Sequence, residues 1–294
     1  VQAVAFSGGK DLMVLLDLVQ RALDPDEFLV VFSDTHMEVS ETLHTLDAAK
    51  AHWPALSFHV ARSSRPALET WRDMGPSRMH RWCCTVHKSA PSLILLRELT
   101  GIDDARVLMY DGVRSSESQS RGSYRMVSAG KKHSLQVNMS PILDWNSAEI
   151  YLYTFARQLP MNPAYRYGAI RCGCVVCPLS SRLWDSLITE RFYDRACGFI
   201  DLLKDYAYGI GIPESEVRTY LSQGGWKGRS GGRGVNAVST RLTETRTSNR
   251  TVFSASSPRE DWKEWFKSLG QLHQESSSSF LVDMPRHGSF AVCY

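Results

Sequence analysis

The chain has 294 residues, of which 43% are hydrophobic and 22% are charged. This composition supplies enough apolar residues for a folded core and excludes a disordered tail or a collagen-like polymer. No apolar run approaches the roughly 18 residues of a membrane-spanning helix, so we expect a soluble protein without a membrane partner. The net charge of +3 does not by itself identify a partner.

Short apolar runs alternate with amphipathic stretches through the first half of the chain. This pattern predicts strands over residues 2–6, 28–33, 56–60 and 105–111. It predicts helices after Gly9, over residues 40–52 and over residues 89–99. Strands that alternate with helices form parallel βαβ units, so the predicted fold class is α/β with a doubly wound, mostly parallel sheet. Ligands of such sheets bind at the carboxyl ends of the strands, here near residues 7–11, 34–35 and 111–114.

The pattern changes after about residue 180. Helices are predicted over residues 183–206 and 213–221, and the glycine-rich run at 222–234 excludes regular structure. Residues 218–250 contain seven Lys or Arg and one Glu, which fits either a loop that contacts a phosphate backbone or a solvated surface loop. We therefore expect a nucleotide-binding domain over residues 1–180 and a helical, loop-rich, basic extension over residues 181–294.

A glycine-rich turn follows the first predicted strand, in the run Ser7-Gly8-Gly9-Lys10-Asp11. Glycines let backbone N–H groups approach an anion, and the following helix N-terminus adds its dipole. The run is not a Walker A motif, which needs four residues between its glycines. It predicts a phosphate-binding loop, with a plain βα turn as the alternative.

Charged residues gather after two other predicted strands. Residues 112–133 contain five basic residues and one acid, which fits an anion clamp or a solvated loop: Arg114, Arg121, Arg125, Lys131, Lys132 and Glu117. Asp34 and Asp111 at strand ends suit Mg²⁺ or a ribose, and the alternative for Asp34 is to cap the following turn.

Five of the seven cysteines lie in two tight groups. The pair Cys83-Cys84 and the later Cys174-Val-Val-Cys177 supply four thiolates, which suit tetrahedral zinc or a 4Fe–4S cluster. Spacing alone does not choose between them, and Cys172 is an extra thiol that could replace one ligand. Such grouping is typical of a reducing compartment, so we expect a cytoplasmic location.

The run Ser7–Asp11 resembles the pyrophosphate-binding loop of the PP-loop ATP pyrophosphatases. Later segments resemble the phosphoadenosine-phosphosulfate (PAPS) reductase-like branch of that superfamily, in the same order as in the family: 31–43, 112–121, 141–151 and 160–179. The resemblance covers about residues 2–180. Leu12 departs from it, because the family usually has Ser or Thr at this position, so one phosphate-loop hydroxyl is missing.

The resemblance implies a set of site residues. The catalytic residues are Lys10, Asp11, Arg114 and Arg121. The nucleotide-binding residues are Ser7, Gly8, Gly9, Asp34, Thr35, Gly112 and Glu117. Adenylylsulfate reductases bind 4Fe–4S with a Cys-Cys-x-x-x-Lys segment and a later Cys-x-x-Cys, which favours iron on Cys83, Cys84, Cys174 and Cys177.

Two enzymatic functions follow from this resemblance. In the first, an ATP-dependent sulfurtransferase uses ATP, Mg²⁺, a 4Fe–4S cluster and a sulfur donor such as a cysteine desulfurase to modify nucleic acid, as in DNA phosphorothioation. In the second, the protein is an adenylylsulfate or phosphoadenylylsulfate reductase. The adjacent cysteine pair favours the reductase, whereas the basic stretch and the lack of the reductase Glu-Cys-Gly-Leu-His run favour the sulfurtransferase, which we expect. A non-catalytic nucleotide-sensing module is the alternative from another class.

Overall fold

The fold is described from a computed structural model that covers residues 1–77, 81–130, 134–228, 242–247, 250–255, 263–267, 270–276, 279–284 and 288–293. The chain divides into two compact units. The first comprises Val1–Thr70 and Trp82–Cys197, and the second comprises Trp71–Arg81 and Gly198–Tyr294. The domain boundary that we expect near residue 180 stays a prediction.

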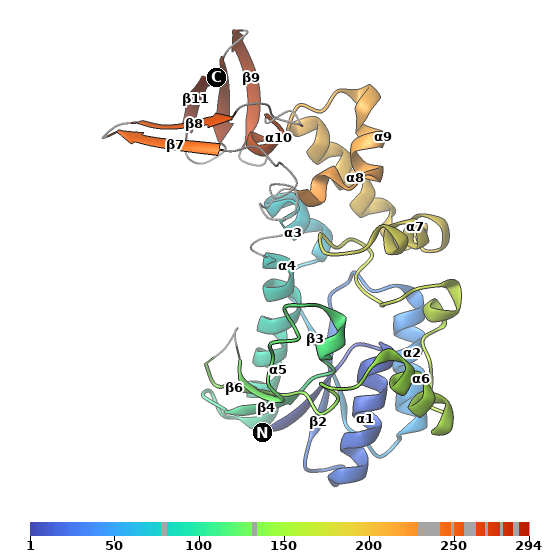
Figure 1. Cartoon of the computed structure of the whole chain (residues 1–294). Coiled ribbons are helices and arrows are strands. Elements are labelled where there is room, and N and C mark those ends of the chain that lie inside the picture. The colour runs from blue at the N-terminus through green and yellow to red at the C-terminus, as the bar shows by residue number, and fades with distance from the viewer. Residues whose placement is uncertain are drawn as a thin grey trace. The chain divides into compact units, whose positions relative to one another are not determined.

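A six-stranded sheet forms the centre of the first unit (Figure 1). Its strand order is β3-β2-β1-β4-β6-β5, and every neighbouring pair is parallel except β5 with β6. The strands are β1 (Gln2–Phe6), β2 (Leu29–Asp34), β3 (Phe58–Arg62), β4 (Val107–Tyr110), β5 (Val127–Ala129) and β6 (Gln136–Met139). The predicted α/β fold with a mostly parallel sheet is confirmed.

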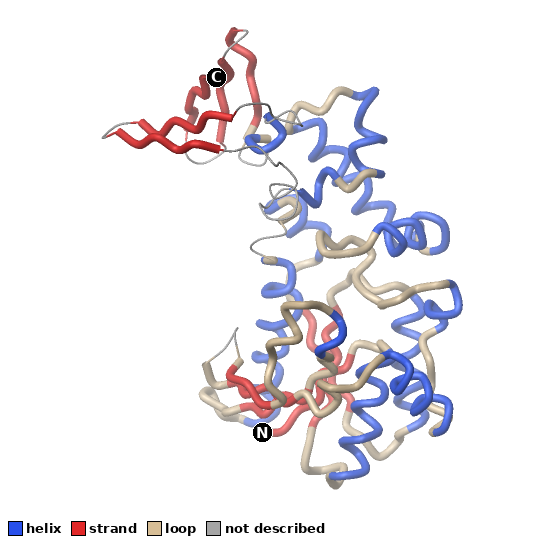
Figure 2. Tube along the Cα trace, viewed as in Figure 1, coloured by secondary structure: helices blue, strands red, loops and turns tan. Residues whose placement is uncertain are grey.

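Helices cover both faces of this sheet (Figures 1 and 2). On one face, strand residues such as Val4 and Phe32 pack against α1 (Lys10–Ala22), α2 (Ser40–His52) and α6 (Ser147–Ala156). On the other face, alternate strand residues such as Val31 and Met109 pack against Leu96 of α5 (Ala90–Thr100). The period of two along each strand therefore divides the core into two layers.

The connection order changes direction beside β1, because β2 and β3 lie on one side of it and β4 lies on the other. This reversal is a topological switch point, where ligands of open α/β sheets bind outside the carboxyl ends of the strands. The predicted phosphate loop follows β1, and Gly112 and Arg114 follow β4. The topology therefore brings these two segments to the same edge of the sheet.

A buried carboxylate joins α1 to α6. Asp17 is 1% exposed and accepts hydrogen bonds from Tyr153 Oη at 2.9 Å, Arg157 Nε at 3.0 Å and Gln20 Nε2 at 3.0 Å. Burial opposes ionisation, but these donors outweigh it and hold the pKa of Asp17 below its usual value. The ionised side chain therefore stabilises the contact between the two helices.

We expect Asp17→Asn to lower the free energy of unfolding by about 3 kcal/mol near pH 7, because it breaks a buried charged network. The folded pKa of Asp17 lies below the unfolded value, so its stabilisation is present above that value and is lost as the pH falls. Urea titrations should show the difference from the parent shrinking below about pH 4. Asp47→Asn, at an exposed position of α2, is the matched control. An equal effect of the two substitutions at neutral pH would contradict this role.

The segment that carries the cysteine pair is helical. Residues Trp82–Cys84 form a single helical turn that continues through a π-helical turn, Thr85–Ser89, into α5. The helix predicted over residues 89–99 therefore begins earlier, and Cys83 and Cys84 lie on its first turn. Two short 3-10 turns, Ser115–Glu117 and Pro163–Tyr167, complete the described connections near the switch point.

The C-terminal part contains both helices and strands. The helix predicted over residues 183–206 is two helices that meet at the buried Phe192. The helix predicted over residues 213–221 corresponds to α9. The helical elements of this part are α7 (Arg182–Arg191), α8 (Tyr193–Gly209), α9 (Glu214–Ser222), a 3-10 turn (Gly225–Gly228) and α10 (Lys263–Phe266). A further helix, α3 (Ala67–Met74), follows β3 in the first half of the chain. In the second unit, the buried Trp71 ring lies 6.0 Å from that of Phe199 and 6.4 Å from that of Trp226.

Two antiparallel sheets, which the sequence pattern did not predict, also lie in the second unit. They comprise β7 (Leu242–Thr247) with β8 (Arg250–Ala255), and β9 (Gln271–Ser276), β10 (Ser279–Met284) and β11 (Gly288–Cys293). The described part of the glycine-rich run, as far as Gly228, contains the end of α9 and a 3-10 turn, so the prediction of no regular structure is wrong there. Residues 229–241 and 248–249 of the predicted basic stretch lie outside the described residues. Among the described helices, none has the length and apolar character needed to cross a membrane.

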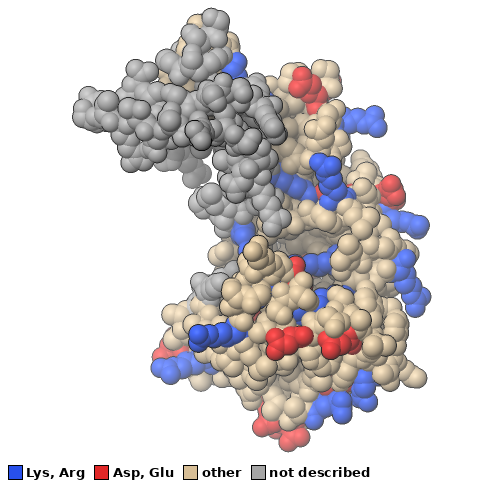
Figure 3. Space-filling model, viewed as in Figure 1, with Lys and Arg blue, Asp and Glu red and all other residues tan. Residues whose placement is uncertain are grey.

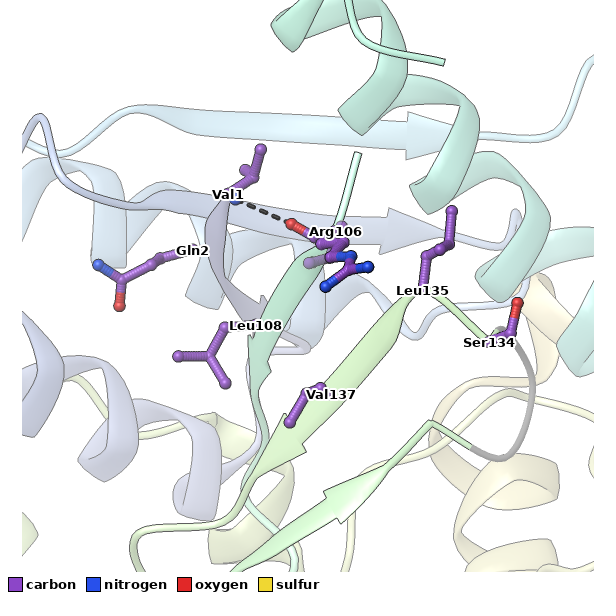
Figure 4. A pocket seen from close by; sticks show the side chains of 8 residues that line it. Val1, Gln2, Arg106, Leu108, Ser134, Leu135 and Val137 are labelled. Atoms are coloured by element: carbon purple, nitrogen blue, oxygen red, sulfur yellow. Dashed lines mark hydrogen bonds between the residues drawn. The ribbon is translucent and has the colours of Figure 1, made fainter. Parts of the chain in front are cut away.

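A cavity of about 390 Å³ lies at the amino ends of β1, β4 and β6 (Figure 4). Its lining includes Gln2, Arg106 and Val137, and the Val1 amino group donates to Arg106 O at 2.9 Å. This cavity is at the opposite end of the strands from the switch point. It is therefore separate from the residues that the sequence singles out.

Candidate functional site

The turn after β1 packs closely against α2 and against Asn162. Gly8 has φ +66°, a left-handed conformation that favours glycine, and a Cβ at this position would come 3.3 Å from Thr42 O. The buried Asn162 donates to Gly8 O at 3.3 Å and to Thr42 Oγ1 at 3.2 Å. Asn162 therefore fixes the loop against α2, although the sequence analysis did not single it out.

Lys10 and Asp11 form the first turn of α1 and contact each other. Lys10 is 6% exposed, and its Nζ lies 2.8 Å from Asp11 Oδ2. Arg114, which follows β4, is 3% exposed and donates from Nε to Asp11 Oδ1 at 2.7 Å. The carboxylate of Asp11 thus joins two cations from the two segments that meet at the switch point. A site with these charges is suited to an anionic ligand.

The guanidinium of Arg114 is occupied by protein groups. Besides Asp11, it donates to Trp145 O at 3.3 Å and to two hydroxyls, at 2.9 Å for Ser116 Oγ and 3.3 Å for Ser147 Oγ. These hydrogen bonds hold the guanidinium in one plane and keep it buried. In this structure Arg114 therefore acts on Asp11, and its predicted catalytic role stays a prediction.

Gly112 lets the end of β4 approach the phosphate loop closely. A Cβ on Gly112 would lie 3.0 Å from Leu12 Cδ2 and 3.3 Å from Asp11 C. Leu12, the residue that departs from the family pattern, therefore fills the space beside Gly112 with an apolar side chain. A larger residue at position 112 would require Leu12 or the backbone of Asp11 to shift by a few tenths of an ångström.

Arg121 forms an ion pair with Glu117, and Glu117 also accepts from the Arg114 N–H at 3.3 Å. Burial and the nearby positive charge of Arg171 lower the pKa of Arg121, while Asp11 and Asp111 act in the opposite direction. Arg121 therefore lies near the phosphate-loop group. The structure brings these predicted residues together, and their roles toward a ligand stay predictions.

Tyr165 lies over the phosphate loop and was not singled out by the sequence analysis. Its hydroxyl accepts the Lys10 backbone N–H at 3.0 Å, and Lys10 Nζ lies 5.6 Å from its ring centroid. Burial raises the pKa of Tyr165, and the nearby Cys172 and Asp11 act in the same direction, so its phenol stays neutral. The first amide of α1, one of the groups that bind phosphate at helix N-termini, is thus capped by a phenol.

Asp34 and Thr35 lie where β2 ends. Asp34 accepts from the His36 N–H at 2.9 Å and pairs with Arg62 of β3; these contacts outweigh burial and lower the pKa of Asp34. Thr35 Oγ1 donates to the buried Glu38 at 2.6 Å and lies 3.9 Å from Cys174 Sγ. Asp34 therefore has protein partners of its own, and Thr35 connects the sheet edge to a cysteine.

The four predicted cluster ligands are linked by electrostatic interactions, and three of them also act on Lys88. Cys83, whose pKa is raised first by a hydrogen bond with Cys84 and then by burial, also interacts electrostatically with Cys174 and Cys177. The pKa of Lys88 is raised by Cys174, with smaller contributions from Cys84 and Cys177. The donor set of soft thiols beside a cation fits zinc or an iron–sulfur cluster. Over the part of the chain that the structure describes, no three His, Cys, Asp or Glu side chains already have metal-binding geometry.

Cys172 belongs to the phosphate-loop group. Burial raises the pKa of its thiol to about 11, and the groups that act on it are Tyr165, Lys10, Glu41 and Asp11. By contrast, the groups that act on Cys174 are Lys88, Glu38, Cys177 and Thr35. Two cysteines only two residues apart therefore face different surroundings.

We expect Cys172→Ser to keep the metal content of the parent protein, because Cys172 lies with the phosphate loop. Iron and acid-labile sulfide in anaerobically purified protein measure this directly. Cys197→Ser is the matched control, since its thiol contacts only Asp194 O, at 3.4 Å, among the described hydrogen bonds. Loss of iron from the Cys172 variant alone would make Cys172 a ligand in place of one of the four.

A cavity of about 770 Å³ lies on the α5 face of the sheet, at the strand ends. Its lining includes Ser33, Asp111, Asn138 and Ser140 from the strands and Lys88 from the π-helical turn. Its size is within the range of nucleotide-sized ligand sites. Burial raises the pKa of Asp111, which accepts from Ser140 Oγ at 2.6 Å. The cavity therefore extends from the edge of the sheet to the residue beside the four thiols.

A profile of the phosphoadenosine phosphosulfate reductase domain matches residues 2–180. An uncharacterised protein of Methanocaldococcus jannaschii is 30% identical over 225 residues, or 76% of this chain and 45% of the relative. The adenosine 5'-phosphosulfate reductase of Anoxybacillus flavithermus is 27% identical over 191 residues, or 64% of this chain and 77% of the relative. A second uncharacterised protein of M. jannaschii also matches, and the chain spans about half the length of these two relatives, 45% and 48%. The PAPS reductase of Candida auris, solved with phosphate, is 16% identical, with a TM-score of 0.45 over 59% of this chain and 80% of that one.

Proposed function

The chain belongs to the phosphoadenosine phosphosulfate reductase domain family, and from this premise we propose that it uses ATP to activate an acceptor oxygen and then replaces that oxygen with sulfur. Membership of the family confirms the resemblance that the sequence motifs predict. One observation carries the proposal. A buried Lys10–Asp11–Arg114 group and a group of four thiols lie on the same sheet unit, at the carboxyl ends of its strands.

The first step splits ATP between its α- and β-phosphates. The acceptor oxygen attacks the α-phosphorus, the new O–P bond forms, and pyrophosphate leaves with the electron pair of the broken bond. Lys10 and the amides at the start of α1 stabilise the charge of the departing pyrophosphate, while Arg114 positions Asp11. We assign Arg121, which lies near Asp11, to the same anion. The nucleoside occupies the 770 Å³ cavity that Asp111 and Ser140 line.

The second step exchanges oxygen for sulfur. A hydrosulfide attacks the activated centre, AMP leaves with the acceptor oxygen, and the proton of the hydrosulfide is released. Oxidation states do not change, because sulfide and oxide replace each other. A cysteine desulfurase with a thiol reductant would supply the hydrosulfide.

Mg²⁺ would share phosphate oxygens with Asp34 or Asp111, since hard cations prefer such ligands.

Cys83, Cys84, Cys174 and Cys177 would hold a 4Fe–4S cluster, in accordance with the donor set and with Lys88 beside it. When bound, the cluster would supply an iron site for sulfur. The protein itself orients these ligands. Trp184 Nε1 donates to Cys174 O at 3.0 Å, and the Leu179 N–H donates to Cys177 Sγ at 3.4 Å. These contacts fix the Cys-x-x-Cys loop against α7.

Reduction of adenylylsulfate is the second candidate. It is favoured by the adjacent cysteine pair followed by Lys88 and by the reductase relatives, which are 26% to 28% identical to this chain. The two reactions have different products. A sulfurtransferase releases pyrophosphate from ATP, whereas a reductase releases sulfite from adenylylsulfate with a thiol reductant.

The test is an incubation of anaerobically purified protein with ATP, Mg²⁺, an oligonucleotide, a cysteine desulfurase and ³⁵S-labelled cysteine. Digestion of the oligonucleotide to nucleotides then locates the label. We expect ³⁵S in a nucleotide, dependent on ATP. No incorporation, together with sulfite release from adenylylsulfate, would favour the reductase. A protein that binds ATP and catalyses neither reaction would be a nucleotide-sensing module.

A further inference from the structure

An aromatic row leads away from the phosphate loop. Tyr165 lies over Lys10, the Tyr151 ring lies 6.4 Å from that of Tyr165, and the Phe155 ring stacks on Tyr151 at 6.2 Å. Phe155, at the end of the row, is 62% exposed. A large apolar ring that is stacked on one side and exposed on the other offers a surface for a further flat ring.

The segment that contains Tyr165 is rich in arginine and lacks acids. From residue 157 to residue 182 there are four arginines and no Asp, Glu or Lys. Arg157 pairs with Asp17, whereas Arg166, Arg171 and Arg182 are exposed and form no ion pair with an acid among the residues that the structure describes. Exposed positive charge therefore follows directly after the residue that caps the phosphate loop.

Aromatic and cationic side chains are interleaved on this surface. The Arg191 guanidinium of α7 lies 5.1 Å from the Tyr167 ring centroid. The positive charge of Arg171 lowers the pKa of Arg121, so Arg171 lies near the phosphate-loop group. Figure 3 shows Lys and Arg side chains along the edge that α7 occupies in Figure 1. We name the set of Phe155, Arg166, Tyr167, Arg171 and Arg191 the arginine–aromatic rim.

We propose that the arginine–aromatic rim binds a single strand of nucleic acid and leads it to the phosphate loop. Proteins bind single strands by stacking bases on aromatic rings and by following the backbone phosphates with basic side chains. The rim supplies both kinds of group within the first unit, beside the loop where the acceptor would be activated. This inference rests on the proposed function for the acceptor, and it places nucleic-acid binding outside the basic stretch at 218–250.

A single strand fits this surface better than a duplex or a protein. A duplex shields the faces of its bases, so the exposed Phe155 would gain no stacking contact from it. An apolar protein surface that matched exposed Leu152 and Phe155 would leave Arg166 and Arg171 without counter-charges. A single strand satisfies both, because each nucleotide brings one ring and one phosphate.

The test measures binding of a fluorescent single strand of about 16 nucleotides, by anisotropy, between about 50 and 200 mM KCl. Arg166→Ala/Arg191→Ala should weaken binding and lower the salt slope by about 1.4, at about 0.7 for each lost phosphate contact. Phe155→Ala should weaken binding about tenfold, and Phe155→Trp should restore it. The matched controls are Arg97→Ala/Arg106→Ala and Ile94→Ala, at exposed positions elsewhere on the same unit.

Pyrophosphate release from ATP at a saturating concentration of the strand separates this inference from the proposed function. The rim variants should keep that activity. If the parent releases no pyrophosphate but the rim variants lose strand binding, the rim stands and the proposed function fails. If rim and control variants bind the strand alike at every salt concentration, or the parent prefers duplex, the rim proposal is wrong. Loss of self-association in Phe155→Ala, with unchanged strand binding, would instead make the rim a protein interface.

Discussion

Lys10→Met should reduce pyrophosphate release from ATP by at least about 100-fold, with little change in thermal stability. The methionine keeps the apolar stem that packs beside Tyr165 and removes only the charge at Nζ. Asp11 keeps its hydrogen bond from Arg114, so the loop should stay in place. Steady-state pyrophosphate release and a melting curve on the same sample measure both effects.

Lys50→Met is the matched control for this substitution. Lys50 lies in the last turn of α2, away from the switch point, and should tolerate the same loss of charge. A fall in activity for both variants would indicate a general charge effect. Normal turnover in Lys10→Met would contradict the assignment of Ser7–Asp11 as the phosphate-binding loop.

Cys174→Ser should remove most of the bound iron and abolish sulfur transfer. Cys174 lies 3.9 Å from Thr35 Oγ1, and Trp184 Nε1 donates to its backbone carbonyl at 3.0 Å. A serine hydroxyl is a much poorer ligand for iron than a thiolate. Pyrophosphate release should partly survive, because Lys10 and Asp11 belong to a different group of contacts.

Iron, acid-labile sulfide and the visible absorption of anaerobically purified protein measure this result. Cys84→Ser should behave in the same way, and Cys197→Ser should resemble the parent. If Cys174→Ser keeps its iron, the four-thiol assignment is wrong. Zinc in place of iron in the parent would keep the ligand set and exclude the cluster.

The sheet could be predicted from sequence because its strands are short apolar runs between amphipathic helices. Val4, Val31 and Met109 alternate between two buried faces, and this period of two is visible without coordinates. The turn at Gly8 could also be predicted, since its glycines and the following helix are local features. The strands β7–β11 were not predicted. β7 and β9 are mostly polar, with the sequences LTETRT and QLHQES, and the apolar residues of β10 follow directly on a run of serines.

The predicted site lacked two residues that act through long-range contacts, Tyr165 and Asn162. Tyr165 meets Lys10 across 155 positions, and Asn162 meets Gly8 across 154. No local pattern encodes such contacts, although both residues lie in a segment that resembles the family. The difference between Cys172 and Cys174 likewise depends on the path of the loop after Gly168, which has φ +96°. Spacing alone left that choice open.

The most direct measurement is the product analysis of ATP labelled with ³²P at the α-phosphate, in the presence of Mg²⁺, sodium hydrosulfide and a single-stranded oligonucleotide. The account predicts labelled AMP and unlabelled pyrophosphate, in equal amounts, from the parent protein and almost none from Lys10→Met. Labelled ADP with inorganic phosphate would contradict cleavage between the α- and β-phosphates. Intact ATP, with sulfite released from adenylylsulfate under the same conditions, would contradict the sulfurtransferase itself.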